Sequence, residues 1–218
     1  MSFADWFALG GIVMVPLLGF SILAVALILE RIIFWVRIVR RQDRFVREIL
    51  KLYAHNPQAT FLKLKQNADL PIARIFLAAL ELDQPNPEEF RIALESSAQA
   101  ELPLLKRFNT VFETIISLSP LLGLLGTILG LIRSFGSLRF GELGGSSTVG
   151  VSAGISEALI ATAFGLIVAI VTLLFANTFR GLYLRQIALI QEYGGQMELL
   201  HRRHYERGNI PSSYPSPT

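Results

Sequence analysis

The chain has 218 residues, of which 52% are hydrophobic, and it carries a formal net charge of +3 with no cysteine. A mean hydropathy of +0.49 is too high for an ordinary soluble domain and indicates a membrane protein with a substantial aqueous part. The absence of cysteine excludes a disulfide framework, thiolate catalysis and thiolate metal sites, and leaves the redox compartment open.

Three apolar runs are long enough to cross a bilayer, which requires roughly 20 helical residues. They are free of charged residues over 6–29, 114–132 and 158–179. Residues 24–26, Ala-Val-Ala, resemble a signal-peptide cleavage site, but no Lys or Arg precedes the first run and it is longer than a usual signal core. We therefore expect an uncleaved anchor and an all-α membrane protein with three transmembrane helices.

The distribution of Lys and Arg predicts the orientation. Residues 34–113 contain twelve of them and the segment from 180 onward contains five, whereas 133–157 contains two and the residues before the first span contain none. Basic segments stay in the cytoplasm, so the N-terminus is expected outside and the C-terminus inside. This placement explains the net charge without a nucleic-acid partner.

The predicted order is a short extracytoplasmic N-terminus (1–5), the first span (6–33), a cytoplasmic helical segment (34–113), the second span (114–132), an extracytoplasmic loop (133–157), the third span (158–179), a cytoplasmic helix (180–208) and a disordered tail (209–218).

The segment after the first span reads as a helix that continues out of the membrane, because apolar residues recur at helical spacing among arginines over 30–54. Some of these arginines are expected to meet the anionic headgroups of membrane lipids. Pro71 and Pro87 suit the first turns of further helices, and Asn86 is a suitable N-cap. Pro103 is expected to bend or interrupt the helix that leads to the second span.

Small and hydroxyl-bearing residues form a stripe along one face of the second span and of the third, at steps of three and four residues. Such stripes pack helices closely in membranes, and alternatively they line a polar path. We expect Gly123, Gly126, Gly130 and Gly165 to serve close packing. The stripes consist of Ser119, Gly123, Gly126, Thr127, Gly130 and Ser134 in the second span, and Ala158, Thr162, Gly165, Ala169, Thr172 and Ala176 in the third.

An acid, Glu157, stands directly before the third span. It either begins the helix as an interfacial acid beside Ser156 or supplies charge at the mouth of a polar path. No ionisable residue lies in the interior of any span, over 6–29, 114–132 or 158–179. A protein that moves protons through a membrane alone normally needs one there. If this chain conducts protons, a partner must therefore bring the titrating side chain.

The sequence offers little support for an enzyme, a metal site or a cofactor. The chain has three histidines, His55, His201 and His204, and the last two lie three residues apart without a third metal ligand nearby. The glycine-rich stretch "FGELGGSSTVG" lacks the Lys of a phosphate-binding loop. Gly194-Gly195 is expected to weaken the last helix.

Two motifs in this order, "LSPLLGLLGTILGLIRSF" and "GISEALIATAFGLIVAI", resemble the MotA/TolQ/ExbB proton-channel family, and most closely its ExbB and TolQ branch. The resemblance implies an inner-membrane motor subunit driven by the proton motive force. It further implies a homo-oligomeric ring of five copies around single-span partners of the ExbD or TolR kind, each with an essential membrane aspartate. Force would then pass to a TonB-like protein that opens outer-membrane transporters, or to a TolA-like protein that serves outer-membrane constriction.

The family's threonines fall on Thr127 in "GLLGT" and on Thr162 in "EALIAT", and its acid falls on Glu157. The resemblance implies that both hydroxyls face the partner aspartate and that Glu157 serves the proton path or complex stability. Many relatives carry a proline near Thr172 that this chain lacks, so Thr172 inherits no role. An ExbB-like role is favoured over a TolQ-like one, and a structural scaffold without proton transport is the alternative from another class.

Overall fold

A computed structural model describes residues 10–139 and 146–208. Every regular element in these two ranges is a helix, which confirms the all-α class. The helices are α2 (Met14–His55), α3 (Pro57–Gln66), α4 (Pro71–Leu80), α5 (Pro87–Leu105), α6 (Asn109–Arg139) and α7 (Ser146–Glu206).

Three of the helical stretches are long and apolar enough to cross a membrane, as the hydropathy predicted. They lie within Met14–His55, Pro87–Gly136 and Gly150–Glu206, and the second of these ranges includes α5 and most of α6. α6 continues to Arg139 and α7 begins at Ser146, so both helices extend into the range 133–157 that was expected to be a loop. The predicted N-terminal segment 1–5 and the predicted tail from 209 onward lie outside the described residues.

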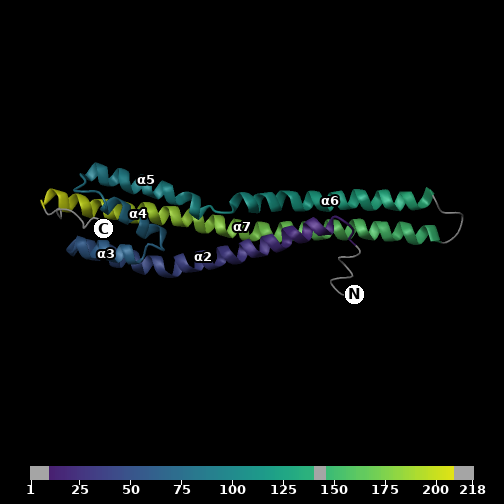
Figure 1. Cartoon of the computed structure of the whole chain (residues 1–218), viewed down its shortest axis with the longest axis horizontal. Coiled ribbons are helices and arrows are strands. Elements are labelled where there is room, and N and C mark those ends of the chain that lie inside the picture. Colours follow the sequence, from purple (N-terminus) through teal and green to yellow (C-terminus); the bar gives the residue numbers. More distant parts are fainter. Residues whose placement is uncertain (1–9, 140–145, 209–218) are drawn as a thin grey trace, which may run out of the picture. The chain divides into compact units, whose positions relative to one another are not determined.

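The contacts divide the chain into two compact units. Unit 1 comprises Met1–Ile32 and Phe108–Phe179, and unit 2 comprises Ile33–Arg107 and Arg180–Thr218. Unit 1 therefore contains the apolar parts of α2, α6 and α7, while unit 2 contains most of the charged residues. Figure 1 shows the antiparallel course of α6 and the first half of α7.

Unit 1 is held together by the start of α2 packing on the other two apolar helices. Val13, Met14 and Leu17 are buried and form a cluster with Leu122, Leu129 and Phe164. Many large apolar side chains on the same three helices are nevertheless exposed. This exposure is expected of helices that meet lipid or neighbouring chains, since soluble proteins rarely expose large contiguous apolar patches. Examples are Ile22 and Val25 in α2, Leu121, Leu124 and Ile132 in α6, and Leu159, Ile170 and Leu174 in α7.

Three helices of unit 2, α3, α4 and α5, begin at residues that are typical of helix N-termini. α3, α4 and α5 each begin with a proline in the first turn, as predicted for Pro71 and Pro87. The Asn86 side chain accepts hydrogen bonds from the backbone N–H groups of Glu88 and Glu89, and the Asn86 N–H in turn donates to the Glu89 carboxylate. This reciprocal capping box satisfies donors that the first turn of a helix leaves free. α5 ends at Leu105, two residues after Pro103, so the predicted interruption before α6 is present.

Polar side chains pair between helices of unit 2, and three of the four that do so, Gln42, Gln186 and Glu101, are buried. Gln42 of α2 and Gln186 of α7 each donate from the side-chain amide to the other's carbonyl oxygen, at 3.2 and 2.6 Å. The Arg74 guanidinium of α4 binds the Glu101 carboxylate of α5 through two nitrogens, at 2.6 and 2.5 Å. Because an unpaired buried polar group is costly, these pairs fix which residues of the helices face each other.

His201 of α7 lies at the centre of an aromatic cluster in unit 2. Its ring stacks on Phe90 with 4.0 Å between ring centroids. Nε2 lies 2.9 Å from the Pro85 carbonyl oxygen, and Nδ1 lies 2.9 Å from the Tyr53 hydroxyl. Since a carbonyl oxygen only accepts, Nε2 carries the hydrogen and Nδ1 accepts from Tyr53. The neutral ring therefore uses both nitrogens, and burial lowers its pKa below the usual value, assisted by the nearby His204.

This environment predicts that unit 2 loses stability as the pH falls. The unfolded chain binds a proton at the ordinary histidine pKa of about 6.5, whereas folded His201 binds it only at lower pH. The stabilisation that neutral His201 contributes is fully present above the unfolded pKa of about 6.5 and decreases as the pH falls below it. We expect the melting temperature to fall between about pH 8 and pH 5.5. A His201→Asn variant is expected to melt lower at pH 8 with a shallower pH slope, while the exposed His55→Asn is a control that keeps the slope. An unchanged slope in His201→Asn would contradict the assignment.

Candidate functional site

Glycines bring the backbones of α6 and α7 close together in unit 1. A Cβ atom built on Gly123 would lie 3.0 Å from the Thr162 Cα, and one on Gly165 would lie 2.5 Å from the Ser119 carbonyl oxygen. A Cβ on Gly130 would lie 2.7 Å from the Gly154 carbonyl oxygen. These distances are shorter than van der Waals contact, so only glycine permits this separation of the two backbones. The glycines of the two stripes are thus in contact with the opposite helix.

The two predicted threonines meet in the middle of this contact. Thr127 Oγ1 of α6 and Thr162 Oγ1 of α7 are 2.6 Å apart. The Thr162 hydroxyl also lies 2.9 Å from the Gly123 carbonyl oxygen, and the Thr127 hydroxyl lies 3.2 Å from the same oxygen. Both side chains are only partly buried. The pair is therefore a small polar group, with a shared carbonyl acceptor, on an otherwise apolar stretch of the two helices.

Glu157 lies where all three apolar helices of unit 1 meet. Its carboxylate forms an ion pair with the Arg133 guanidinium of α6, and the Glu157 side chain is 19% exposed. It also lies against Gly11, just before α2 begins; a Cβ on Gly11 would collide with the Glu157 carboxylate. The Gly11 φ of +71° lies in the left-handed region that favours glycine. Gly11 thus permits the chain to turn into α2 in direct contact with the Glu157 side chain.

The other hydroxyls of the stripes have different surroundings. Thr172 is buried and its hydroxyl donates to the Val168 carbonyl oxygen, one turn back in its own helix, at 2.7 Å. Ser134 donates to the Val151 carbonyl oxygen at 3.2 Å. Ser119 is fully buried, and its hydroxyl has no hydrogen-bond partner among the described residues. Of the residues singled out from the sequence, the structure thus joins Thr127 to Thr162, while Thr172 bonds within its own helix.

Sequence reasoning missed two parts of this arrangement. The first is Arg133, which in the sequence only follows the second apolar run, but in the structure forms an ion pair with Glu157. Gly154 was not assigned to a stripe, although a Cβ there would lie 2.8 Å from the Gly130 carbonyl oxygen and collide with the Ser134 hydroxyl. Gly154 continues the third-span stripe by one step of four from Ala158, so extending the periodicity past the span would have found it.

The chemistry available at this site is limited and specific. The hydroxyls both donate and accept hydrogen bonds, and Glu157 provides a carboxylate at one end. No ionisable side chain lies between the charged ends of the apolar runs 114–132 and 158–179. No group of three or more potential metal ligands occurs within ranges 10–139 and 146–208. The pair can therefore hold or pass a proton only together with a titrating group from elsewhere.

The fold and this site define a multi-pass helical membrane protein whose second and third apolar helices share a hydroxyl pair. The profile of the "MotA/TolQ/ExbB proton channel family" matches residues 67–192, more than half of the chain. The chain belongs to this family, and its three apolar helices and its relatives support a multi-pass inner-membrane protein.

Two relatives from Synechocystis sp. are similar over most of their length. The biopolymer transport protein named ExbB-like 3 is 65% identical over 91% of this chain and 94% of its own length. The one named ExbB-like 1 is 42% identical over 95% of this chain and 82% of its own length. The Tol-Pal system protein TolQ of Haemophilus influenzae is 28% identical over 94% of this chain and 96% of its own length.

We expect the Arg133 and Glu157 charges to be energetically coupled. Arg133→Glu alone places two acids together and should lower the melting temperature in detergent, whereas Arg133→Glu with Glu157→Arg should restore most of it. Because Arg133 is largely exposed, the coupling in a double-mutant cycle should be about 0.5–1 kcal/mol. Arg133→Lys keeps the charge and serves as the control. Additive effects of the two reversals would show that the ion pair contributes nothing to folding.

Proposed function

We propose that this chain is a proton-channel subunit that works with a single-span partner carrying a membrane carboxylate. In the bacterial inner membrane, with the N-terminus outside and the C-terminus in the cytoplasm, it would convert the proton motive force into mechanical work. That work would energise TonB-dependent transport across the outer membrane. The relatives named biopolymer transport proteins support a transport role in general. Five copies would form a ring around partner chains of the ExbD or TolR kind.

The observation that carries the proposal is the hydroxyl pair of Thr127 and Thr162, whose oxygens lie 2.6 Å apart between the uncharged runs 114–132 and 158–179. Close packing of α6 and α7 is sufficient to explain the glycines. It does not require hydroxyls at both Thr127 and Thr162, facing each other across the contact. A partner carboxylate brought to the pair would find donors and acceptors in a region that otherwise offers none. Glu157, at the end of the same contact, would hold charge at the mouth of the path.

The driving force is sufficient for mechanical work. One elementary charge that crosses a potential of 100 mV releases about 2.3 kcal/mol, so the passage of a few protons can drive a conformational step. The chain supplies no titrating group inside its spans, so the proton must pass through the partner's carboxylate. The proposal therefore requires both chains for proton passage.

The relative named TolQ supports a second candidate, a subunit of the Tol-Pal system that acts with a TolA-like protein. The two ExbB-like relatives are more similar to this chain, at 65% and 42% identity against 28%. We therefore favour the ExbB-like role. A structural scaffold remains the candidate from another class, and it requires no proton movement.

The test begins with native mass spectrometry of the full chain in mild detergent, alone and with a co-expressed single-span partner. We expect a closed ring of five that retains partner chains. The same complex in liposomes should then take up protons when a potential is applied, and should not do so without the partner. Monomers or dimers that persist with the partner, or a ring that passes no protons, would favour the scaffold.

A further inference from the structure

The charges of unit 2 are segregated along the sequence. Residues 37–65 contain eight basic and two acidic residues, whereas residues 81–101 contain six acidic residues and one basic residue. The first range covers the second half of α2 and nearly all of α3; the second covers the turn after α4 and most of α5. The two ranges lie in the same compact unit, which therefore has a strongly positive part and a strongly negative part.

The positive part is a straight row on α2. The basic residues recur at alternating steps of three and four, so their side chains share one side of the helix. All five are exposed, and within the described ranges none of their side chains has an ion pair or hydrogen bond. Four of them line an open groove of about 750 Å³ together with Asp43 and Glu48. This basic face consists of Arg37, Arg40, Arg44, Arg47 and Lys51.

The negative part is at the turn from α4 to α5. Glu81 and Asp83 are exposed and have no ion pair within the part of the chain that the structure describes. Glu89 is exposed and binds only the Asn86 N–H of the capping box. Two further acids share one cation, because Arg91 pairs with both. This acidic face consists of Glu81, Asp83, Glu88, Glu89 and Glu95.

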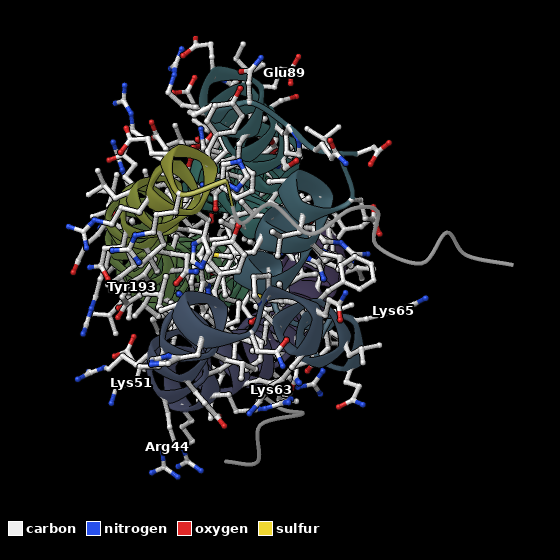
Figure 2. The ribbon with its side chains drawn as sticks, turned by 90° about the vertical axis from the view of Figure 1, so that its left-hand side faces the viewer. Arg44, Lys51, Lys63, Lys65, Glu89 and Tyr193 are labelled. Atoms are coloured by element: carbon white, nitrogen blue, oxygen red, sulfur yellow. The ribbon has the colours of Figure 1, made fainter. Side chains whose placement is uncertain are left out.

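The two faces point to different sides of unit 2. In Figure 2, Arg44 and Lys51 of the basic face lie at the bottom of the view, and Glu89 of the acidic face lies at the top. Charges so placed cannot neutralise one another within one copy. They match the acidic and basic faces of other copies. A contact between two different faces can repeat from copy to copy, and it forms a ring when the rotation between copies closes.

We propose that the basic face on α2 of one copy binds the acidic face at the α4–α5 turn of the next copy. This inference rests on the ring in the proposed function and identifies where adjacent subunits meet outside the membrane. Lipid headgroups fit the basic face less well. The row from Arg37 to Lys51 extends about 21 Å along the helix, whereas the headgroup layer of one leaflet is only about 5–8 Å thick.

The contact can be tested by disulfide crosslinking, because the chain contains no cysteine. A variant with both Arg44→Cys and Asp83→Cys is oxidised in mild detergent with the partner present. We expect a ladder of covalent oligomers that ends at the subunit number of the ring. Each single variant should give no product larger than a dimer. Arg44→Cys with Glu192→Cys, an exposed acid on α7 outside the acidic face, is the matched control and should give no ladder.

Charge reversal gives a second and independent measurement. Arg40→Glu, Arg44→Glu and Arg47→Glu together should lower the fraction of assembled ring about tenfold, as should Glu81→Lys with Asp83→Lys and Glu89→Lys. Combining both sets in every chain should restore assembly. The native ring should also weaken near 1 M salt, where the screening length is about 3 Å.

The outcomes separate this interface from the proposed function. A ring that forms normally but gives no ladder and ignores both reversals would overturn the interface alone. A loss of bound anionic lipid on reversal of the basic face, with the ring intact, would identify that face as a lipid site and also overturn it. Failure of the unmodified chain to form any ring with its partner would overturn the proposed ring, and the interface with it.

Discussion

Replacing Thr127 and Thr162 together with valine is expected to stop proton movement while the protein still assembles. Valine keeps the volume of threonine but removes the hydroxyl, and with it the 2.6 Å contact between the two oxygens and their contacts with the Gly123 carbonyl oxygen. Interhelical hydrogen bonds in membranes contribute only about 0.6 kcal/mol on average, so the helices should stay packed. A positioned proton-transferring group commonly accounts for about a hundredfold in rate, and we expect at least that loss of proton uptake in liposomes.

The control for this experiment is Thr172→Val. Thr172 is equally polar and more deeply buried, but its hydroxyl donates to Val168 in its own helix. Its replacement should leave proton uptake unchanged, and Thr127→Ser with Thr162→Ser should retain most of it because the hydroxyls remain. Normal proton uptake by the double valine variant in an intact ring would rule out the threonine pair as part of the path. The scaffold interpretation would then lead.

Gly165→Val is expected to separate α6 from α7 and to destabilise the protein severely. A Cβ at Gly165 would lie 2.5 Å from the Ser119 carbonyl oxygen and 3.1 Å from the Gly123 Cα. These are backbone atoms, which cannot rotate away as a side chain can. Overpacking a close contact costs about 1–3 kcal/mol, and a branched side chain against backbone should exceed the upper value. The melting temperature in detergent should fall accordingly, and proton uptake should be lost because the threonine pair needs the same close approach.

Gly19→Val provides the matched control in the same unit. Gly19 is exposed on α2, and a Cβ there would have no atom within 4 Å. The substitution should therefore change the melting temperature little. Gly165→Ala should fall between the two, since it adds only the first carbon. Equal melting temperatures for Gly165→Val and Gly19→Val would show that the close approach of α6 and α7 is not needed for folding.

The sequence predicted the class of fold well because hydropathy and helical periodicity are local properties. The three apolar runs, the first-turn prolines and the Asn86 cap each depend on neighbouring residues only. The stripes likewise placed Thr127 and Thr162 on the faces where the structure brings them together. The sequence was less informative about helix ends, since α6 continues to Arg139 and α7 begins at Ser146, inside the range expected to be a loop. The predicted helix over 180–208 is present as the second half of α7. It runs through Gly194-Gly195, and Tyr193 and Met197 on either side of the two glycines are buried.

By itself, the sequence determined that this protein is an all-α membrane protein with three apolar helices and two small-residue stripes, since these features follow from residue type and spacing. The tertiary structure decided which residues of different helices meet. It paired Glu157 with Arg133 beneath Gly11 and left Thr172 bonded within its own helix. It also buried His201 between Tyr53 and Pro85. These contacts depend on how far each helix slides and turns against its neighbours. That register is set by packing over the whole unit rather than by any local pattern.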